Sequence, residues 1–165
     1  MQRYQLAQLN IAAMKAPLDS PPMADFVADL DRINTLADAS AGFVWRLQDE
    51  DGDATALHPF GENFVVNMSV WWDIESLHAF AFRSGHVEVL RRRRDWFTPQ
   101  TEAYAVLWWV PQGHLPTMAE AAERLAHLKE FGPTAYAFTF KEPFASPAAE
   151  GQRGRVAFDD ECPTA

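Results

Sequence analysis

The order of secondary-structure elements expected along this chain predicts an α+β fold built on one antiparallel sheet. Three observations lead to it: several segments alternate in residue type as strands do, others repeat apolar residues at helical spacing, and the two kinds follow the order β-α-β-β-α-β-α-β. The first six elements have the order of a split βαβ, or ferredoxin-like, sandwich, with helices on one face of the sheet. We assign residues 1–145 to this single domain and residues 146–165 to a mobile tail.

The first strand and helix are expected over residues 4–14 and 21–39. In the strand, Leu6, Gln8 and Asn10 share one face. Ser20 suits the N-cap of the helix and Pro21 its first position. The apolar residues of the helix recur at helical spacing: Met23, Phe26, Val27, Leu30, Ile33 and Ala37.

The second and third strands are expected over residues 43–48 and 64–72, with an acidic turn over residues 49–53 between them. Strands on both sides of this turn argue against a helix-loop-helix calcium site. In the third strand, Asn67, Ser69 and Trp71 share one face.

Two helical pieces are expected next, over residues 74–83 with Asp73 as the cap and over residues 86–97 with Ser84 as the cap. A fourth strand is expected over residues 103–110. Thr117 and Glu120 then form a capping box that opens a helix closed by Gly132. A fifth strand is expected over residues 135–141 because aromatic and small residues alternate there.

Composition limits the possible functions. The 165 residues include 14 Lys and Arg against 23 Asp and Glu, a formal net charge of −9. Binding to nucleic acid or to an anionic membrane is not expected, because that affinity comes mostly from neutralising phosphates. Cys162 is the one cysteine, so no internal disulfide is possible. We see no signal peptide and no apolar run of membrane-spanning length, and we expect a cytoplasmic protein.

Several strands are apolar on both faces, so the face of the sheet away from the helices also needs cover. In the fourth strand, for example, Leu107 and Trp109 alternate with Val106, Trp108 and Val110. A second copy of the chain is the simplest partner for that face, and a homodimer is therefore expected.

Five stretches of the sequence resemble a bacterial family, described as domain of unknown function 3291. They are Leu6-Ala7-Gln8-Leu9-Asn10-Ile11, Gly42-Phe43-Val44-Trp45-Arg46, Asn67-Met68-Ser69-Val70-Trp71, Trp108-Trp109-Val110-Pro111 and the helical stretch from His86 to Phe97. The resemblance covers roughly residues 4 to 144. It implies a branch of the dimeric α+β barrels, whose relatives include antibiotic-biosynthesis monooxygenases and haem-degrading monooxygenases. The family description implies no activity.

The candidate functional residues are polar or aromatic side chains within apolar strands and the helix that follows the third strand. We expect catalytic roles for His86, Asn67 and Trp71, and substrate-binding roles for Asn10, Trp45, Arg46, Ser69, Arg93, Trp96 and Trp108. Asn67 could equally satisfy its amide by bonding to neighbouring backbone. The tryptophans could serve as core packing or stack on a flat ligand.

Two resemblances sharpen these roles. Asn67 and Trp71 are similar in spacing to an Asn and a Trp with which related barrel monooxygenases orient an aromatic substrate and oxygen. Asn10, Trp71 and His86 are similar to a trio in haem-degrading relatives, in which the histidine is the haem ligand. The connection Ser84-Gly85 before His86 departs from the second pattern.

His86 is also a candidate general base. It begins a helix, where the positive end of the dipole favours neutral imidazole. The run Arg91-Arg92-Arg93-Arg94 sweeps a full helical turn, so at least one arginine must point toward the sheet, and Arg93 shares a helical face with His86.

Three functions remain open at the level of sequence. The first is a cofactor-independent monooxygenase or isomerase that acts on an aromatic or polyketide-like substrate at a site between sheet and helices. The second is a haem-binding or haem-degrading protein. The third is a non-catalytic dimer that binds a metabolite. No metal site is expected, because the five histidines lack the spacing of a helical metal site.

Overall fold

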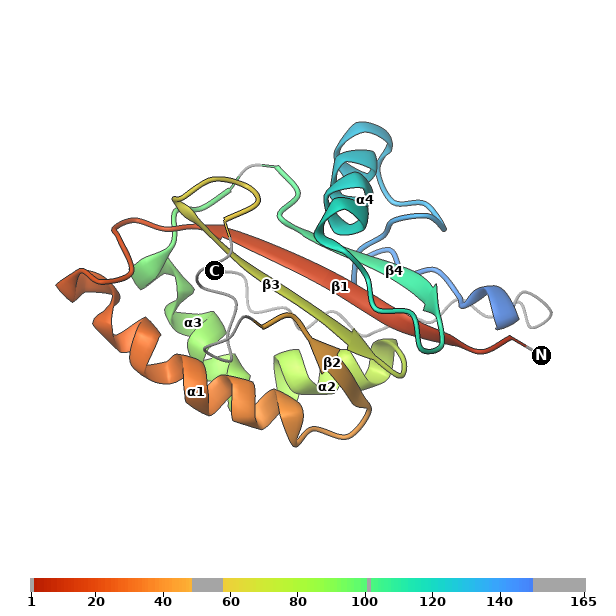
Figure 1. Ribbon diagram of the computed structural model, residues 1–165, viewed down its shortest axis with the longest axis horizontal. Helices are drawn as coiled ribbons and strands as arrows, with labels where there is room; N and C mark the ends of the chain where they lie inside the picture. Colours follow the sequence, from red (N-terminus) through yellow and green to blue (C-terminus); the bar gives the residue numbers. More distant parts are fainter. Residues whose placement is uncertain (1, 49–57, 101, 150–165) are drawn as a thin grey trace.

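The computed structural model describes residues 2–48, 58–100 and 102–149. Its sheet has four strands in the order β2-β3-β1-β4, and every neighbouring pair is antiparallel (Figure 1). The strands are β1 (Tyr4–Ala13), β2 (Phe43–Arg46), β3 (Phe64–Trp71) and β4 (Ala105–Pro111). The helices are α1 (Ala24–Asp38), α2 (Ile74–Arg83), α3 (His86–Trp96) and α4 (Met118–Phe131), with short 3-10 turns η1 (Pro21–Met23) and η2 (Pro147–Ala149).

The predicted α+β, ferredoxin-like arrangement is confirmed. The first strand lies between the third and the fourth, because the connection through α1 to β2 leaves room for β3 to pair with β1. The register of β1 and β3 places Gln8 opposite Ser69 and Asn10 opposite Asn67. Residues that are distant in sequence therefore share the centre of the sheet.

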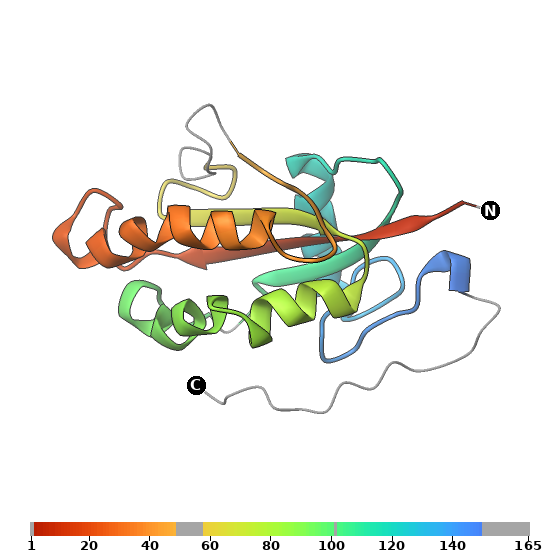
Figure 2. The ribbon, with the colours of Figure 1, turned by 90° about the horizontal axis from the view of Figure 1, so that it is seen from below.

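Helices cover both faces of the sheet, and this corrects the expectation that they lie on one face only. Leu125 and Leu128 of α4 pack with Ala7 and Leu9 of β1 in one core cluster. Leu6 and Trp71 belong to a second cluster with Leu77 of α2. Since successive residues of a strand point to opposite faces, α4 lies on the face away from α2 (Figures 1 and 2). The apolar face expected to be open is thus packed against the chain's own last helix.

The side of the sheet that faces α1, α2 and α3 has an interrupted core. One apolar cluster gathers around Leu6 and Trp71, and another gathers around Ala12 and Trp96. Between them, the inward residues of the two central strands are polar: Gln8, Asn10, Asn67 and Ser69. We call these four residues the polar strip.

The start of the first helical segment differs from the prediction. Ser20 precedes the 3-10 turn η1, but its hydroxyl donates to the Pro17 carbonyl and does not cap the turn. The reason is local, because Pro21 and Pro22 have no N–H to offer it. The expected caps Asp73 and Thr117 are confirmed, and they accept from the N–H groups of Ser76 and Glu120.

The expected fifth strand over residues 135–141 is wrong. Phe138 alone of that segment pairs with β4, through two backbone hydrogen bonds to Leu107 of 2.8 and 2.9 Å. Thr134 and Ala137 bond to each other across a tight turn, so their backbone groups are not available to a strand. The alternation of aromatic and small residues correctly predicted that Phe138 is buried. It did not predict that the segment forms only an isolated bridge with β4.

The acidic turn over residues 49–53, most of the expected tail and Cys162 fall outside the described residues. Among the helices that are described, none combines the length and apolar character needed to cross a bilayer.

Candidate functional site

The polar strip lies in the middle of the sheet yet reaches solvent. Asn67 is exposed although β3 is a central strand, while Gln8 and Asn10 are half-buried and Ser69 is buried. Central strand positions between two layers are ordinarily closed by apolar packing. These four polar side chains, of which Asn67 is exposed, are therefore the candidate site between sheet and helices.

A chain of hydrogen bonds joins the strip to Trp71. The indole Nε1 of Trp71 donates to Oγ of Ser69 at 2.8 Å. Nε2 of Gln8 donates to the same oxygen at 3.0 Å and to Oδ1 of Asn67 at 2.5 Å. The sequence-predicted residues Asn67, Ser69 and Trp71 are thus connected through Gln8.

Aromatic rings extend this chain toward α3. Phe80 of α2 stacks on Trp71 with ring centroids 5.1 Å apart and an interplanar angle of 26°. The ring of His86 in turn contacts Phe80, and the centroids of these two rings are 4.9 Å apart. Phe43 meets Trp71 edge-on at 5.3 Å. Hence His86 is two ring contacts away from Trp71.

The protonation state of His86 follows from its contacts. Nδ1 lies 3.2 Å from the carbonyl oxygen of Ala81, and because a carbonyl can only accept, Nδ1 carries the proton. Burial lowers the pKa of His86 below its ordinary 6.5, against the opposing effect of the Ala81 hydrogen bond. The neutral ring therefore keeps its lone pair on Nε2. The expected neutral imidazole is attributed here to burial.

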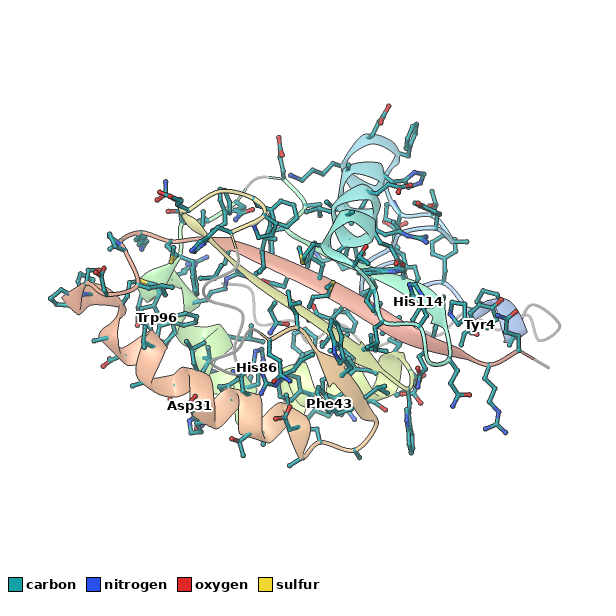
Figure 3. All side chains as sticks on the ribbon, in the orientation of Figure 1. Tyr4, Asp31, Phe43, His86, Trp96 and His114 are labelled. Carbon is teal, nitrogen blue, oxygen red and sulfur yellow. The ribbon has the colours of Figure 1, made fainter. Side chains whose placement is uncertain are left out.

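Helix α3 spans the strip from one apolar cluster to the other. It begins at His86, beside Phe80, and ends at Trp96, which packs with Phe26 and Phe97. Figure 3 shows Trp96, His86 and Phe43 following one another along the direction of α1. Of the eleven residues of α3, Trp96 alone is fully buried.

The beginning of α3 is held by Ser84, as expected. The hydroxyl of Ser84 accepts from the His86 N–H at 3.1 Å, although Gly85 is the residue directly before the helix. This contact joins the end of α2 to the start of α3 and contributes to fixing the His86 backbone.

A cationic side chain borders the strip. Arg46 of β2 lies opposite Ser69 in the register, and its side chain is only 14% exposed. Its Nε bonds to Asp38 at the end of α1 at 2.8 Å. The ion pair holds the guanidinium on the strip side of the sheet, opposite Ser69.

Two arginines of the α3 run make different contacts. Arg93 turns toward the sheet, and its guanidinium carbon lies 4.5 Å from the centre of the Tyr104 ring. Arg92 bonds to Asp25 and Asp95, and it lies over Trp96. Arg93 is thus the arginine that meets the sheet side, at its Tyr104 margin.

Three tryptophans that were expected to bind substrate lie away from the strip. Trp45 and Trp108 point to the α4 face of the sheet, because each alternates with a residue on the strip side. Trp108 is fully buried, and its Nε1 donates to Glu120. Trp96 is 1% exposed within the cluster around Met23. The three rings thus pack with core clusters, away from the polar strip.

The haem interpretation is also tested by this geometry. Trp71 and His86 would have to face one macrocycle, but the ring of Phe80 lies between them. The residues present therefore do not fit a haem held between His86 and Trp71. Among the described residues, no group of three or more His, Cys, Asp or Glu side chains is placed to hold a metal ion.

Two members of the site were not assigned a role from the sequence. Gln8 was on the same expected strand face as Asn10, but only the antiparallel register brings it to Ser69 and Asn67. Phe80 was expected simply as an inward residue of its helix, and its position between Trp71 and His86 depends on the turn from α2 into α3.

The chain was compared with known proteins. The model of the family described as domain of unknown function (DUF3291) matches residues 5–154. No curated protein matches. A protein of unknown function, NE2512 from Nitrosomonas europaea, is 15% identical, with a TM-score of 0.45, over 69% of this chain and 94% of its own.

SnoaB, a cofactor-independent oxygenase from Streptomyces nogalater, is 18% identical, with a TM-score of 0.40, over 69% of this chain and 96% of its own. Its N63A mutant is 17% identical, with a TM-score of 0.42, over 68% and 98%. At these identities and TM-scores the likeness carries no inference about activity.

Proposed function

Because this chain belongs to the family described as domain of unknown function 3291, whose description assigns no activity, we propose a function from the geometry of the site itself. The protein is a small-molecule enzyme that removes a proton from a flat aromatic or polyketide-like substrate. His86 is the general base, and the polar strip holds the oxygen on which negative charge develops.

One observation carries the proposal: the hydrogen bond to Ala81 places the proton of neutral His86 on Nδ1, which leaves Nε2 as the acceptor of the ring. Its Nδ1 proton is engaged by Ala81, and burial lowers its pKa. A positioned neutral imidazole typically contributes about 10²- to 10⁴-fold to a proton transfer. The Phe80 ring beside it, which stacks in turn on Trp71, supplies apolar surface for a flat substrate.

Proton removal beside a carbonyl produces an enolate. Return of the proton at another carbon would complete an isomerisation. Attack of the electron-rich carbon on dioxygen would instead convert a CH₂ group and O₂ into a carbonyl group and water. The substrate itself supplies the four electrons of the second reaction, so no further reductant is required.

The proposal is tested with anthrone, a flat aromatic ketone whose CH₂ group is acidic. Under nitrogen in D₂O, the protein should accelerate deuterium exchange at that CH₂ group above the rate in buffer. In air, oxygen uptake then separates an oxygenase from an isomerase. His86→Gln should reduce the catalysed exchange by at least 100-fold.

His127→Gln is the matched control, because His127 also packs between aromatic rings but lies in contact with Phe131 and Tyr136, outside the site. It should leave exchange within twofold of the original protein. Equal exchange by the original protein and the His86→Gln variant would reject His86 as the base. A Soret band in the purified protein would favour a haem protein instead.

A further inference from the structure

We infer that the polar strip selects a ligand oxygen that is anionic, an enolate or phenolate, and that Gln8 is the positioning residue that turns the hydrogen-bond donors toward it. The inference rests on the proposed function and specifies the chemical class of its substrate. It is argued from the direction of each hydrogen bond between Trp71 and Asn67.

The donor and acceptor of each hydrogen bond can be assigned starting from Trp71. An indole N–H can only donate, so Oγ of Ser69 must accept from Trp71. The same oxygen also accepts from Nε2 of Gln8. These two donors together occupy both lone pairs of the oxygen. The Ser69 proton is therefore directed to neither neighbour and is available to a further acceptor.

The direction then passes to Asn67. Gln8 donates to Oδ1 of Asn67, so the NH₂ group of Asn67 points away from Gln8. In the part of the chain that the structure describes, no residue accepts from this NH₂ group, and Asn67 is exposed. The strip thus presents the N–H donors of the exposed Asn67 amide to a ligand, with the Ser69 hydroxyl and Oε1 of Gln8 beside them.

An ion pair lies near the strip. Arg46 faces the strip side opposite Ser69, and its ion pair with Asp38 keeps the guanidinium in place. Hydrogen bonds to an ionised oxygen are about twice as strong as those between neutral groups. A ligand oxygen that is negative, or becomes negative on proton loss to His86, matches these donors best.

The test uses two probes of one shape. At neutral pH, 2-hydroxy-1,4-naphthoquinone is a flat enolate, whereas 2-methoxy-1,4-naphthoquinone is neutral. Calorimetric titration of the full chain should give an enolate affinity at least tenfold higher than that of the ether. Gln8→Leu, which removes the donors without changing charge, should reduce this preference at least fivefold.

A second variant reverses the direction of the hydrogen bond between residue 8 and Asn67. In Gln8→Glu the carboxylate can only accept, so Asn67 should turn its NH₂ group toward it and present Oδ1 to the ligand. The preference should then shift by at least tenfold toward 2-amino-1,4-naphthoquinone, which presents N–H donors, relative to the ether. Because both of these probes are neutral, the added charge alone does not produce that shift.

Asn67→Asp and Asn63→Asp form a matched pair with the same charge change. Asn67 lies in the strip, and Asn63 lies just before β3. Asn67→Asp should lower enolate affinity at least tenfold, while Asn63→Asp should leave the preference within twofold. Equal affinity for enolate and ether, absence of binding, or an unchanged preference in both Gln8 variants would overturn the inference.

The two proposals can fail separately. Binding of the naphthoquinones needs no turnover and leaves His86 intact. Enolate preference without anthrone exchange would keep the ligand class and reject the catalytic proposal. Exchange that depends on His86, without enolate preference, would keep the enzyme and reject the inference about the polar strip.

Discussion

Gly42 takes a backbone conformation that other residues rarely adopt, with φ of +81°, at the turn between α1 and β2. A Cβ atom there would lie 2.2 Å from Oγ of Ser76, far inside van der Waals contact. The first turn of α2 therefore packs directly on this backbone. Only a residue without a side chain allows this approach.

Gly42→Ala should destabilise the protein by about 3 kcal/mol or more, because overpacking adds to the backbone strain. Gly113→Ala is the matched control. Gly113 has φ of +87°, but no atom lies within 4 Å of its would-be Cβ, so the change should cost about 1 kcal/mol. Urea unfolding of both variants gives the comparison, and equal losses would contradict the role of the Ser76 contact.

The buried, neutral state of His86 predicts a pH dependence of the proposed activity. Burial lowers its pKa, so the base takes up its proton, and the activity declines, as pH falls through a value below 6.5. The pH at which the anthrone exchange rate constant is half of its maximum should therefore lie below 6.5. A decline centred above pH 6.5 would contradict the assignment.

The same shift affects stability, with a defined sign. Unfolded His86 takes up a proton near pH 6.5 and folded His86 only at lower pH, so its contribution is present above pH 6.5 and is lost as pH falls toward the folded pKa. His78, whose pKa is lowered by burial and by Arg83, acts in the same direction. His86→Gln should therefore flatten the pH dependence of the urea midpoint below pH 6.5, relative to His127→Gln.

At the scale of elements, the Glu120 carboxylate forms a hydrogen bond between α4 and β4. Glu120 accepts from Nε1 of Trp108 at 2.9 Å and from Nε2 of His114 at 2.7 Å. Burial raises the pKa of Glu120, but the hydrogen bonds from His114 and Trp108 lower it more. The residue whose backbone N–H is capped by Thr117 thus also satisfies, through its carboxylate, a buried indole on the sheet.

Glu120→Ala should cost about 1–3 kcal/mol, because it leaves the buried Trp108 N–H without a partner. The control is Glu123→Ala in the same helix, where the exposed carboxylate accepts from the Tyr136 hydroxyl. That change should cost less than about 0.5 kcal/mol. Thermal unfolding measures both, and a loss from Glu120→Ala no larger than that from Glu123→Ala would contradict the attachment.

At the scale of the whole molecule, a homodimer stays a prediction. Light scattering should give a mass of about twice 18.6 kDa. Because α4 covers the sheet face expected to meet a second copy, the contact would include the outer side of α4, where Phe131 is 63% exposed. Phe131→Lys should then lower the mass toward that of one chain.

Val27→Lys is the control for this experiment, since Val27 is 42% exposed on α1, and it should leave the mass unchanged. A single chain at micromolar concentration in the original protein would reject the dimer. Trp109 lies on the strip side of the sheet, where its Nε1 donates to the Phe144 carbonyl.

Local rules determined much of this protein. Alternation and helical spacing predicted four strands and four helices close to their observed bounds, and Asp73 and Thr117 cap as their residue types predict. The strip side of β3 followed from alternation alone. These features depend on neighbours within a few residues, which the sequence displays directly.

Only the tertiary structure decided the rest. Whether Phe138 continues a ladder depends on the turn before it, and the side on which α4 packs depends on its connection from β4. Gln8 meets Asn67 because two strands 59 residues apart pair in one register, and Phe80 separates Trp71 from His86 because α2 turns into α3 at Gly85. Periodicity shows which residues share a face, but long-range packing decides which faces and side chains meet.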